Sequence, residues 1–211
     1  MPHTLDLFAD STTVIGNAAD NYLPCDGEVY YYGKILTAST AAQYLQCLLQ
    51  QIAWQHDRAV IYGREHITAR QVAWYGDQAF SYRYSGTEKV ALAWITPLLE
   101  LKQLVEQQCQ SQFNACLLNL YANGSQGMAW HRDAETQLQA GAAIASLSLG
   151  AERKFSFKHR LSQQKVDLYL ENGSLLLMAG ATQQHWLHRL PPSQKISQPR
   201  LSLTFRCMRL D

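Results

Sequence analysis

The sequence lacks any run of about 20 apolar residues, the length that spans a bilayer, so we expect no association with a membrane. Its first ten residues, MPHTLDLFAD, lack the Lys or Arg that opens a signal peptide, and no export is expected. The five cysteines are odd in number, widely separated and without a CxxC pair, which argues against a disulfide framework or a zinc cluster. These absences favour a cytoplasmic protein.

The chain also lacks internal repeats, low-complexity tracts and long Gly/Ser linkers, so its 211 residues predict one domain, which we expect to be monomeric. Charge divides it unevenly. Residues 1–33 hold five acidic residues and no Lys or Arg, whereas residues 34–211 hold 18 basic and 12 acidic residues. We expect an acidic segment over 1–33, partly disordered or folded over the core, and a basic domain over 34–211. A basic body permits a polyanionic partner without requiring one.

Hydrophobic spacing places helices first and strands second. A helix is predicted over 41–54 behind a cap at Thr37 or Ser39, and another begins near Pro97 and continues through 98–112. From about residue 113 the sequence predicts short strands at 113–121, 143–150, 153–159, 166–170, 174–180 and 200–206. This order indicates an α+β fold, with a double-sheet β core buttressed by N-terminal helices, rather than a Rossmann-like alternation.

His131 and Asp133 stand two residues apart, so extended backbone points both side chains to one face, as two ligands of one metal require. Chance alone predicts about 0.3 such triplets in this composition, and the alternative is a surface His beside a turn Asp. A third candidate is His188, which follows three predicted strands. Two imidazoles and one carboxylate leave open positions at an octahedral metal, as in non-heme Fe(II) oxygenases.

The segment 200–206 alternates strictly, with Arg200, Ser202, Thr204 and Arg206 on one face. One interpretation is an ordinary half-buried strand whose polar face lies in water. The other is that this face lines a cavity, where two arginines need anionic partners that a dicarboxylate would supply. Asn119 and Tyr121 share the same i, i+2 spacing; taken alone, they read as a strand-terminal turn residue and a rim aromatic.

Four ordered blocks, at 119–135, 146–157, 173–191 and 200–206, make the sequence resemble the AlkB-type Fe(II)- and 2-oxoglutarate-dependent nucleic-acid dioxygenases over residues 23–207. The resemblance implies a double-stranded β-helix (jelly-roll) core at about 113–208 and His131, Asp133 and His188 as iron ligands. It favours His188 over His185 because the family places this ligand two residues after a tryptophan, here Trp186. The residues that it implies for 2-oxoglutarate are Asn119, Tyr121, Arg200, Ser202, Thr204 and Arg206, although Ser202 stands where the family usually has Asn.

The N-terminal half is similar to the DNA-repair branch, closest to the animal homologues that act on duplex DNA. That similarity implies a substrate-binding cover at about 58–90. Tyr62 would fill the gap left by a flipped base, Tyr82, Tyr84 and Ser85 would line the base pocket, and Glu135 would reach the exocyclic amine of the base. Without the resemblance, this tyrosine-rich stretch is ordinary strand composition.

Cationic side chains that would hold phosphates are also present, although for any one of them a solvated strand face is the simpler interpretation. They are Arg153, Lys154, Lys158, His159, Arg160, Arg64, Arg70 and Arg132.

The resemblance therefore predicts an enzyme that demethylates N-alkylated bases in DNA, such as 1-methyladenine and 3-methylcytosine. It would use Fe(II) and O2, convert 2-oxoglutarate to succinate and CO2, and release formaldehyde. The partner is then alkylated DNA, with RNA as a further candidate. Two alternatives remain: a 2-oxoglutarate dioxygenase acting on RNA or protein, and a non-catalytic binding module of the same fold.

Overall fold

The computed structural model describes residues 20–61, 64–84 and 87–210. The strands that build its two main sheets are β1 Glu28–Lys34, β2 Gln55–Ile61, β3 Arg64–Gly76, β6 Leu92–Ala93, β7 Ala115–Tyr121, β8 Met128–His131, β9 Ile144–Gly150, β10 Arg153–His159, β11 Lys165–Leu170, β12 Ser174–Ala179, β13 Trp186–Leu190 and β14 Arg200–Arg206.

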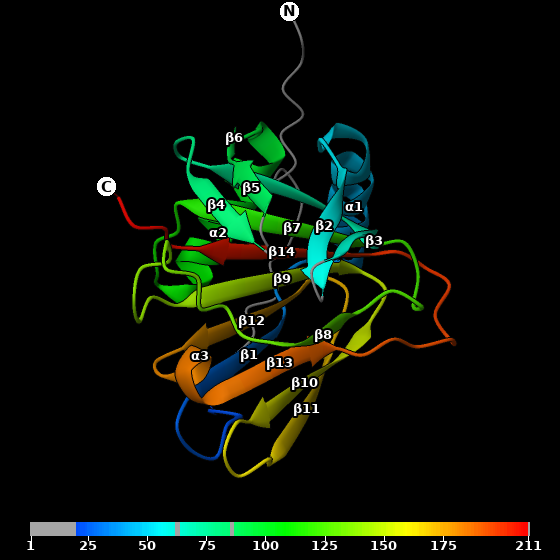
Figure 1. The fold of residues 1–211 in the computed structure, drawn as a ribbon. Coiled ribbons are helices and arrows are strands. Elements are labelled where there is room, and N and C mark those ends of the chain that lie inside the picture. The colour runs from blue at the N-terminus through cyan, green and yellow to red at the C-terminus, as the bar shows by residue number, and fades with distance from the viewer. Residues whose placement is uncertain (1–19, 62–63, 85–86, 211) are drawn as a thin grey trace, which may run out of the picture.

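Two sheets face each other in the manner of a jelly roll (Figure 1). The larger sheet has the order β1-β12-β9-β14-β7-β3-β2, with β6 beside β3, and the smaller has the order β11-β10-β13-β8. Every pairing in them is antiparallel except that of β3 with β6. The expected double-sheet β core is confirmed.

Two helices cover the outer face of the larger sheet (Figure 1). In α1 (Ala38–Gln51), Tyr44 and Leu48 are fully buried, and in α2 (Thr96–Cys109), Leu98 and Leu101 are fully buried. The hydroxyl of Thr37 caps α1 by accepting a hydrogen bond from the Thr40 amide at 3.2 Å. The helix ends at Gln51, three residues before the predicted end.

The N-terminal segment enters the sheet earlier than the acidic composition suggested. β1 pairs with β12 along its length, so it crosses the boundary expected at residue 33. The charge pattern gave no sign of this strand. As an edge strand, β1 can carry a charged residue at each end, Glu28 and Lys34, so its charges do not distinguish it from the acidic segment before it.

Between the two helices the chain forms β2 to β6, which include the range of about 58–90 expected for a substrate cover and extend past both of its ends. β2 and β3 extend the larger sheet, whereas β4 (Ser81–Tyr84) and β5 (Thr87–Val90) pair only with each other. The range expected for a cover therefore contains strands of the core sheet as well as a separate hairpin.

Among the described helices, none is long and apolar enough to cross a membrane.

Candidate functional site

Strand pairing brings His131 and His188 together. His131 ends β8, His188 lies in the middle of β13, and the two residues are directly opposite in the antiparallel register. Their ring centroids are 4.2 Å apart. Asp133, two residues beyond the end of β8, completes a group whose potential ligand atoms all lie within 4.8 Å of one another. The three residues predicted as one site therefore meet in space.

Hydrogen bonds and charge prepare this group for a cation. Nδ1 of His131 lies 2.8 Å from the carbonyl oxygen of Ala129, a contact that fixes the ring and leaves Nε2 available as a ligand. The buried Arg206 donates from Nη2 to Oδ1 of Asp133 at 3.0 Å. Burial raises the pKa of Asp133, but the electrostatic effect of its neighbours, of which the Arg206 guanidinium is the largest, outweighs burial, so the pKa lies below its ordinary value and the carboxylate stays ionised.

His188 is held in its neutral form. Its side chain is 4% exposed, and the ring of Phe155 stacks on it with centroids 5.5 Å apart. Burial is the main cause that lowers the pKa of His188 to about 3, with the neighbouring His131 adding to it. A neutral imidazole is the form that ligates a metal. Its Nδ1 is buried without a hydrogen-bond partner in the described structure.

This donor set fits iron. Two imidazoles and one carboxylate on one side of a cavity form the facial arrangement that non-heme Fe(II) uses, with further positions open to other ligands. Asp133 and His188 are buried and His131 is half-buried, so the site is enclosed by the two sheets yet reachable on the His131 side.

The polar face of β14 points into the same space between the sheets. All seven residues of β14 are buried, so the interpretation that this face lies in water is wrong. Arg200 is directly opposite Tyr121 of β7, and Ser202 is opposite Asn119 of β7 and Ser148 of β9. The alternating pattern therefore separates a cavity face from the apolar face that packs under the helices.

Arg200 is a buried cation whose charge is not neutralised by any carboxylate in the described chain. The side chain is 2% exposed; Nη2 donates to the Ser148 hydroxyl at 2.9 Å, and its guanidinium carbon lies 5.8 Å from the centroid of the Tyr121 ring. Its Nε has no hydrogen-bond partner. Burial lowers the pKa of Arg200 to about 10, Tyr121 opposes this effect, and Arg153 adds to it. An anionic ligand would satisfy this guanidinium.

One cavity joins the metal-ligating group to the β14 face. The Ser202 hydroxyl lies 3.2 Å from that of Ser146, so it is partly occupied within the protein. The residues that line the cavity are Asn119, Tyr121, Met128, His131, Asp133, Glu135, Ser146, Phe155, Met178, His188, Leu190, Arg200, Ser202, Thr204 and Arg206. Every residue predicted to hold 2-oxoglutarate is among them.

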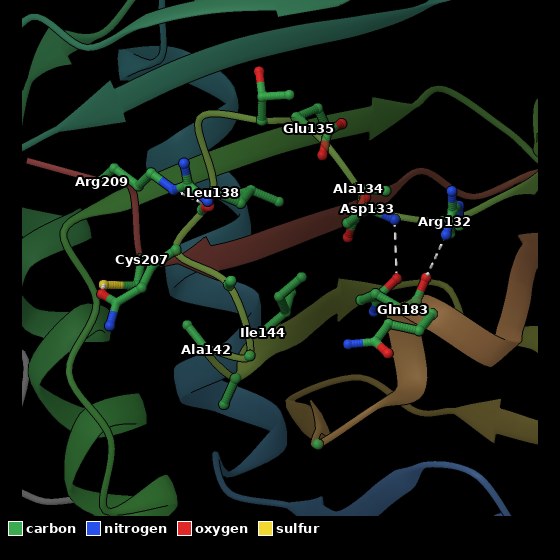
Figure 2. Close-up of a pocket in the computed structure, with 17 residues that line it drawn as sticks. Arg132, Asp133, Ala134, Glu135, Leu138, Ala142, Ile144, Gln183, Cys207 and Arg209 are labelled. Carbon is green, nitrogen blue, oxygen red and sulfur yellow. Dashed lines mark hydrogen bonds between the residues drawn. The ribbon is translucent and has the colours of Figure 1, made fainter.

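A second cavity lies beside the first and shares Asp133 and Glu135 with it (Figure 2). It is bounded by the loop that follows β8, by α3 (Thr182–His185) and by residues after β14. Arg132 lines this second cavity and donates to the main-chain oxygen of Gln183 at 3.3 Å. Arg132 and Glu135 thus line the same cavity as Asp133, and their roles in substrate binding stay predictions.

The remaining predicted base-pocket residues are not placed. Tyr62 and Ser85 lie outside the described residues. Tyr82 and Tyr84 are carried by β4, but their side chains are outside the described part of the structure. Their roles stay predictions.

The structure separates the predicted phosphate-binding cations. Arg153 is 1% exposed, and its Nη2 donates to the carbonyl oxygens of Gly124, Gln126 and Pro191, so its proposed contact with phosphate is wrong. Arg70 is also buried, with Nη1 against the sulfur of Met128. The sequence could not identify these two residues, because it does not show whether an arginine side chain is buried or exposed.

His185, the competing third ligand, turns away from the group. Its ring stacks against that of His159, with centroids 6.2 Å apart and planes 6° apart. The α3 helix ends at His185 and β13 begins at Trp186, and this change of backbone sends the two histidines to different places.

Two residues in direct contact with the metal-ligating group escaped sequence reasoning. Phe155 stacks on His188, and Gln183 accepts a hydrogen bond from the Asp133 amide at 2.9 Å. The strand pattern of 153–159 placed Phe155 on one face of β10 but gave no sign of which residue it would meet. No sequence signal marks Gln183.

Comparison with known proteins gives matches over most of the chain. Residues 28–206 match the family described as the 2OG-Fe(II) oxygenase superfamily. The DNA oxidative demethylase ALKBH2 of Bos taurus is 38% identical over 192 residues, which cover 87% of this chain and 68% of the relative. The ALKBH2 of Homo sapiens is 38% identical over 71% of this chain and 60% of its own length.

A second group of relatives is represented by the alpha-ketoglutarate-dependent dioxygenase alkB homolog 3 of Homo sapiens, 34% identical over 84% of this chain and 65% of its own length. The chain thus spans about two thirds of the length of these relatives. A solved structure, that of OsALKBH1, matches with a TM-score of 0.62 at 16% identity, over 88% of this chain and all of the other. That structure supports the fold alone.

Proposed function

Because this chain belongs to the 2OG-Fe(II) oxygenase superfamily, we propose that it is an Fe(II)- and 2-oxoglutarate-dependent dioxygenase that demethylates N-alkylated bases in DNA. The observation that carries the proposal is one cavity with two kinds of charge. Asp133 lines it together with His131 and His188, and the guanidinium of Arg200 lines it as well. A metal ion and a dianion would neutralise both kinds of charge at once.

In this proposal His131, Asp133 and His188 bind the iron. Arg206 keeps Asp133 ionised and fixes the direction of its carboxylate, while Phe155 packs against His188 and excludes water from that side. With iron and 2-oxoglutarate bound, O2 would be the oxidant: one oxygen atom would pass to succinate as 2-oxoglutarate loses CO2, and the other would hydroxylate an N-methyl group, which then leaves as formaldehyde.

The β14 face would bind the cosubstrate. Arg200 offers Nε to a carboxylate of 2-oxoglutarate, and Tyr121 and Asn119 lie on the facing positions of β7. Ser202 and Thr204 continue the same polar face toward Arg206. These contacts would hold the cosubstrate in one orientation beside the three metal ligands that line the same cavity.

The substrate proposal draws on the relatives named as DNA oxidative demethylases. Alkylated bases of the 1-methyladenine and 3-methylcytosine type are the proposed targets, with Glu135 at the cavity wall toward the exocyclic amine and Arg132 beside it toward phosphate. Tyr62, Tyr82, Tyr84 and Ser85 are proposed for the cover. Action on RNA, a cytoplasmic location and a monomeric state stay predictions.

Formaldehyde release from methylated single- and double-stranded DNA and RNA tests the proposal. Changing His131 or Asp133 to Ala should abolish release, because each removes one of three ligands. His185→Ala is the matched control and should retain activity, since that ring lies outside the metal-ligating group. Full activity in His131→Ala or Asp133→Ala would overturn the site assignment. Formaldehyde release from methylated RNA but not from methylated DNA would contradict DNA as the substrate and would leave the proposed demethylation reaction unchanged.

A further inference from the structure

Helix α3 holds the segment that carries the carboxylate ligand. One residue of this four-residue helix makes two contacts with that segment (Figure 2). The side-chain Oε1 of Gln183 accepts from the Asp133 amide at 2.9 Å, and its main-chain oxygen accepts from Nη1 of Arg132 at 3.3 Å. A single residue thus fixes both the backbone and a neighbouring side chain of the His-x-Asp segment.

Asp133 needs this contact because it lies beyond the end of strand pairing. β8 ends at His131, so the amide of Asp133 has no ladder partner, yet the residue is only 6% exposed. A buried amide without an acceptor is strongly unfavourable. Gln183 supplies the acceptor, and its own Nε2 points to the sulfur of Met178 at 3.4 Å, which sets the orientation of the amide group.

The helix itself is anchored at both ends. Thr182 is 1% exposed, and its hydroxyl donates to the Ala179 carbonyl at 2.6 Å and accepts from the Glu28 amide at 2.8 Å. At the other end α3 passes directly into β13, which carries His188. The element that positions Asp133 is therefore continuous with the strand that supplies another ligand.

We propose that Gln183 is a positioning residue for the metal site: it sets the place of the Asp133 carboxylate relative to His131 and His188. This inference rests on the proposed iron site. The side chain of Gln183 makes no hydrogen bond with either histidine in the described structure, so its effect on the ligands would be transmitted through the Asp133 amide.

Titration of the metal-free protein with Co2+ tests this role, with the absorption bands of bound Co2+ as a report of ligand geometry. Gln183→Met keeps the length of the side chain and removes the acceptor. We expect Co2+ to bind roughly 10- to 100-fold more weakly, the usual effect of losing a residue that orients a ligand, and the bands to shift at saturating metal. Gln184→Met is the matched control, because it makes the same change at an exposed neighbour in α3.

Gln183→Glu provides the rescue, because a carboxylate keeps an oxygen for the Asp133 amide, and its affinity for Co2+ should stay near that of the unchanged protein. Equal affinities and spectra in Gln183→Met and Gln184→Met would overturn the proposal, as would weak binding in Gln183→Glu with an unchanged fold. If Gln183→Met does not fold, Gln183→Ala replaces it, since water can then reach the amide. Unchanged Co2+ affinity and bands in that variant overturn the proposal equally.

His131→Ala separates this inference from the proposed iron site. If His131→Ala loses Co2+ while Gln183→Met binds normally, the iron site stands and the role of Gln183 is rejected. If His131→Ala binds Co2+ as the unchanged protein does, the assignment of the metal site is wrong, and the proposed role of Gln183, which rests on it, is rejected with it.

Discussion

Arg200→Met should have opposite effects on two properties of the protein. It should stabilise the ligand-free chain and, at the same time, nearly abolish binding of 2-oxoglutarate. The reason is that Arg200 is buried beside a hydroxyl and an aromatic ring, with no carboxylate of the described chain to neutralise it. Such a cation is unfavourable until an anion arrives.

The size of the stability effect follows from the electrostatics. A pKa of Arg200 lowered by burial to about 10 corresponds to roughly 3 kcal/mol of destabilisation of the charged, folded side chain at neutral pH. Loss of the hydrogen bond to Ser148 opposes this by about 1–2 kcal/mol. The free energy of unfolding of the ligand-free variant should therefore rise by about 1–2 kcal/mol, which raises the melting temperature by roughly 2–8 °C in a chain of this length.

The effect on binding should be larger and opposite in sign. Removing one partner of a buried, hydrogen-bonded charge pair costs roughly 2–5 kcal/mol, or at least about 30-fold in the dissociation constant for 2-oxoglutarate. Calorimetric titration with Mn2+ in place of iron measures this constant, and thermal melts without ligand measure the stability.

Arg153→Met is the matched control, because Arg153 is an equally buried arginine with a structural role. Its Nη2 donates to three carbonyl oxygens from two loops, and the substitution leaves all three without that donor. We expect a loss of about 3 kcal/mol in the free energy of unfolding. If Arg200→Met also destabilises the ligand-free protein by this amount, or if it binds 2-oxoglutarate as well as the unchanged protein does, the reasoning about an uncompensated cation is wrong.

Two further predictions concern acid and the cover. Burial holds the pKa of His188 at about 3 in the metal-free protein, far below its ordinary value, so the unfolded chain binds a proton that the folded chain does not. The melting temperature of the metal-free protein should therefore fall as the pH decreases from about 6.5 toward 3, and fall less in His188→Asn; parallel curves for the two proteins would contradict this. In the cover, Tyr62→Ala should lose more formaldehyde release from duplex than from single-stranded methylated DNA, and an equal loss would remove the proposed finger.

The sequence predicted some strands of the fold with correct bounds and did not predict others. Strands 153–159 and 200–206 were predicted with the bounds that the structure has, because alternation of polar and apolar residues reports directly on two unlike faces. β1, β2, β8 and β13 were not predicted as strands. A position at a sheet edge does not explain this, because β11 is also an edge strand and was predicted, whereas β13 lies inside its sheet. β8 and β13 have only four and five residues, which leaves little alternation to recognise.

The sequence by itself was enough to identify the candidate metal ligands and the polar face of 200–206. The His-x-Asp spacing, the distant His188 and the alternating arginines of 200–206 were readable because strand period fixes which side chains share a face. Only the tertiary structure decided what that face meets. It placed the polar side of β14 in a buried cavity rather than in water, turned His185 away from the metal-ligating group, buried Arg153 among carbonyl oxygens and set Gln183 against Asp133. Each of these outcomes depends on contacts between segments far apart in the chain, and local spacing carries no information about them.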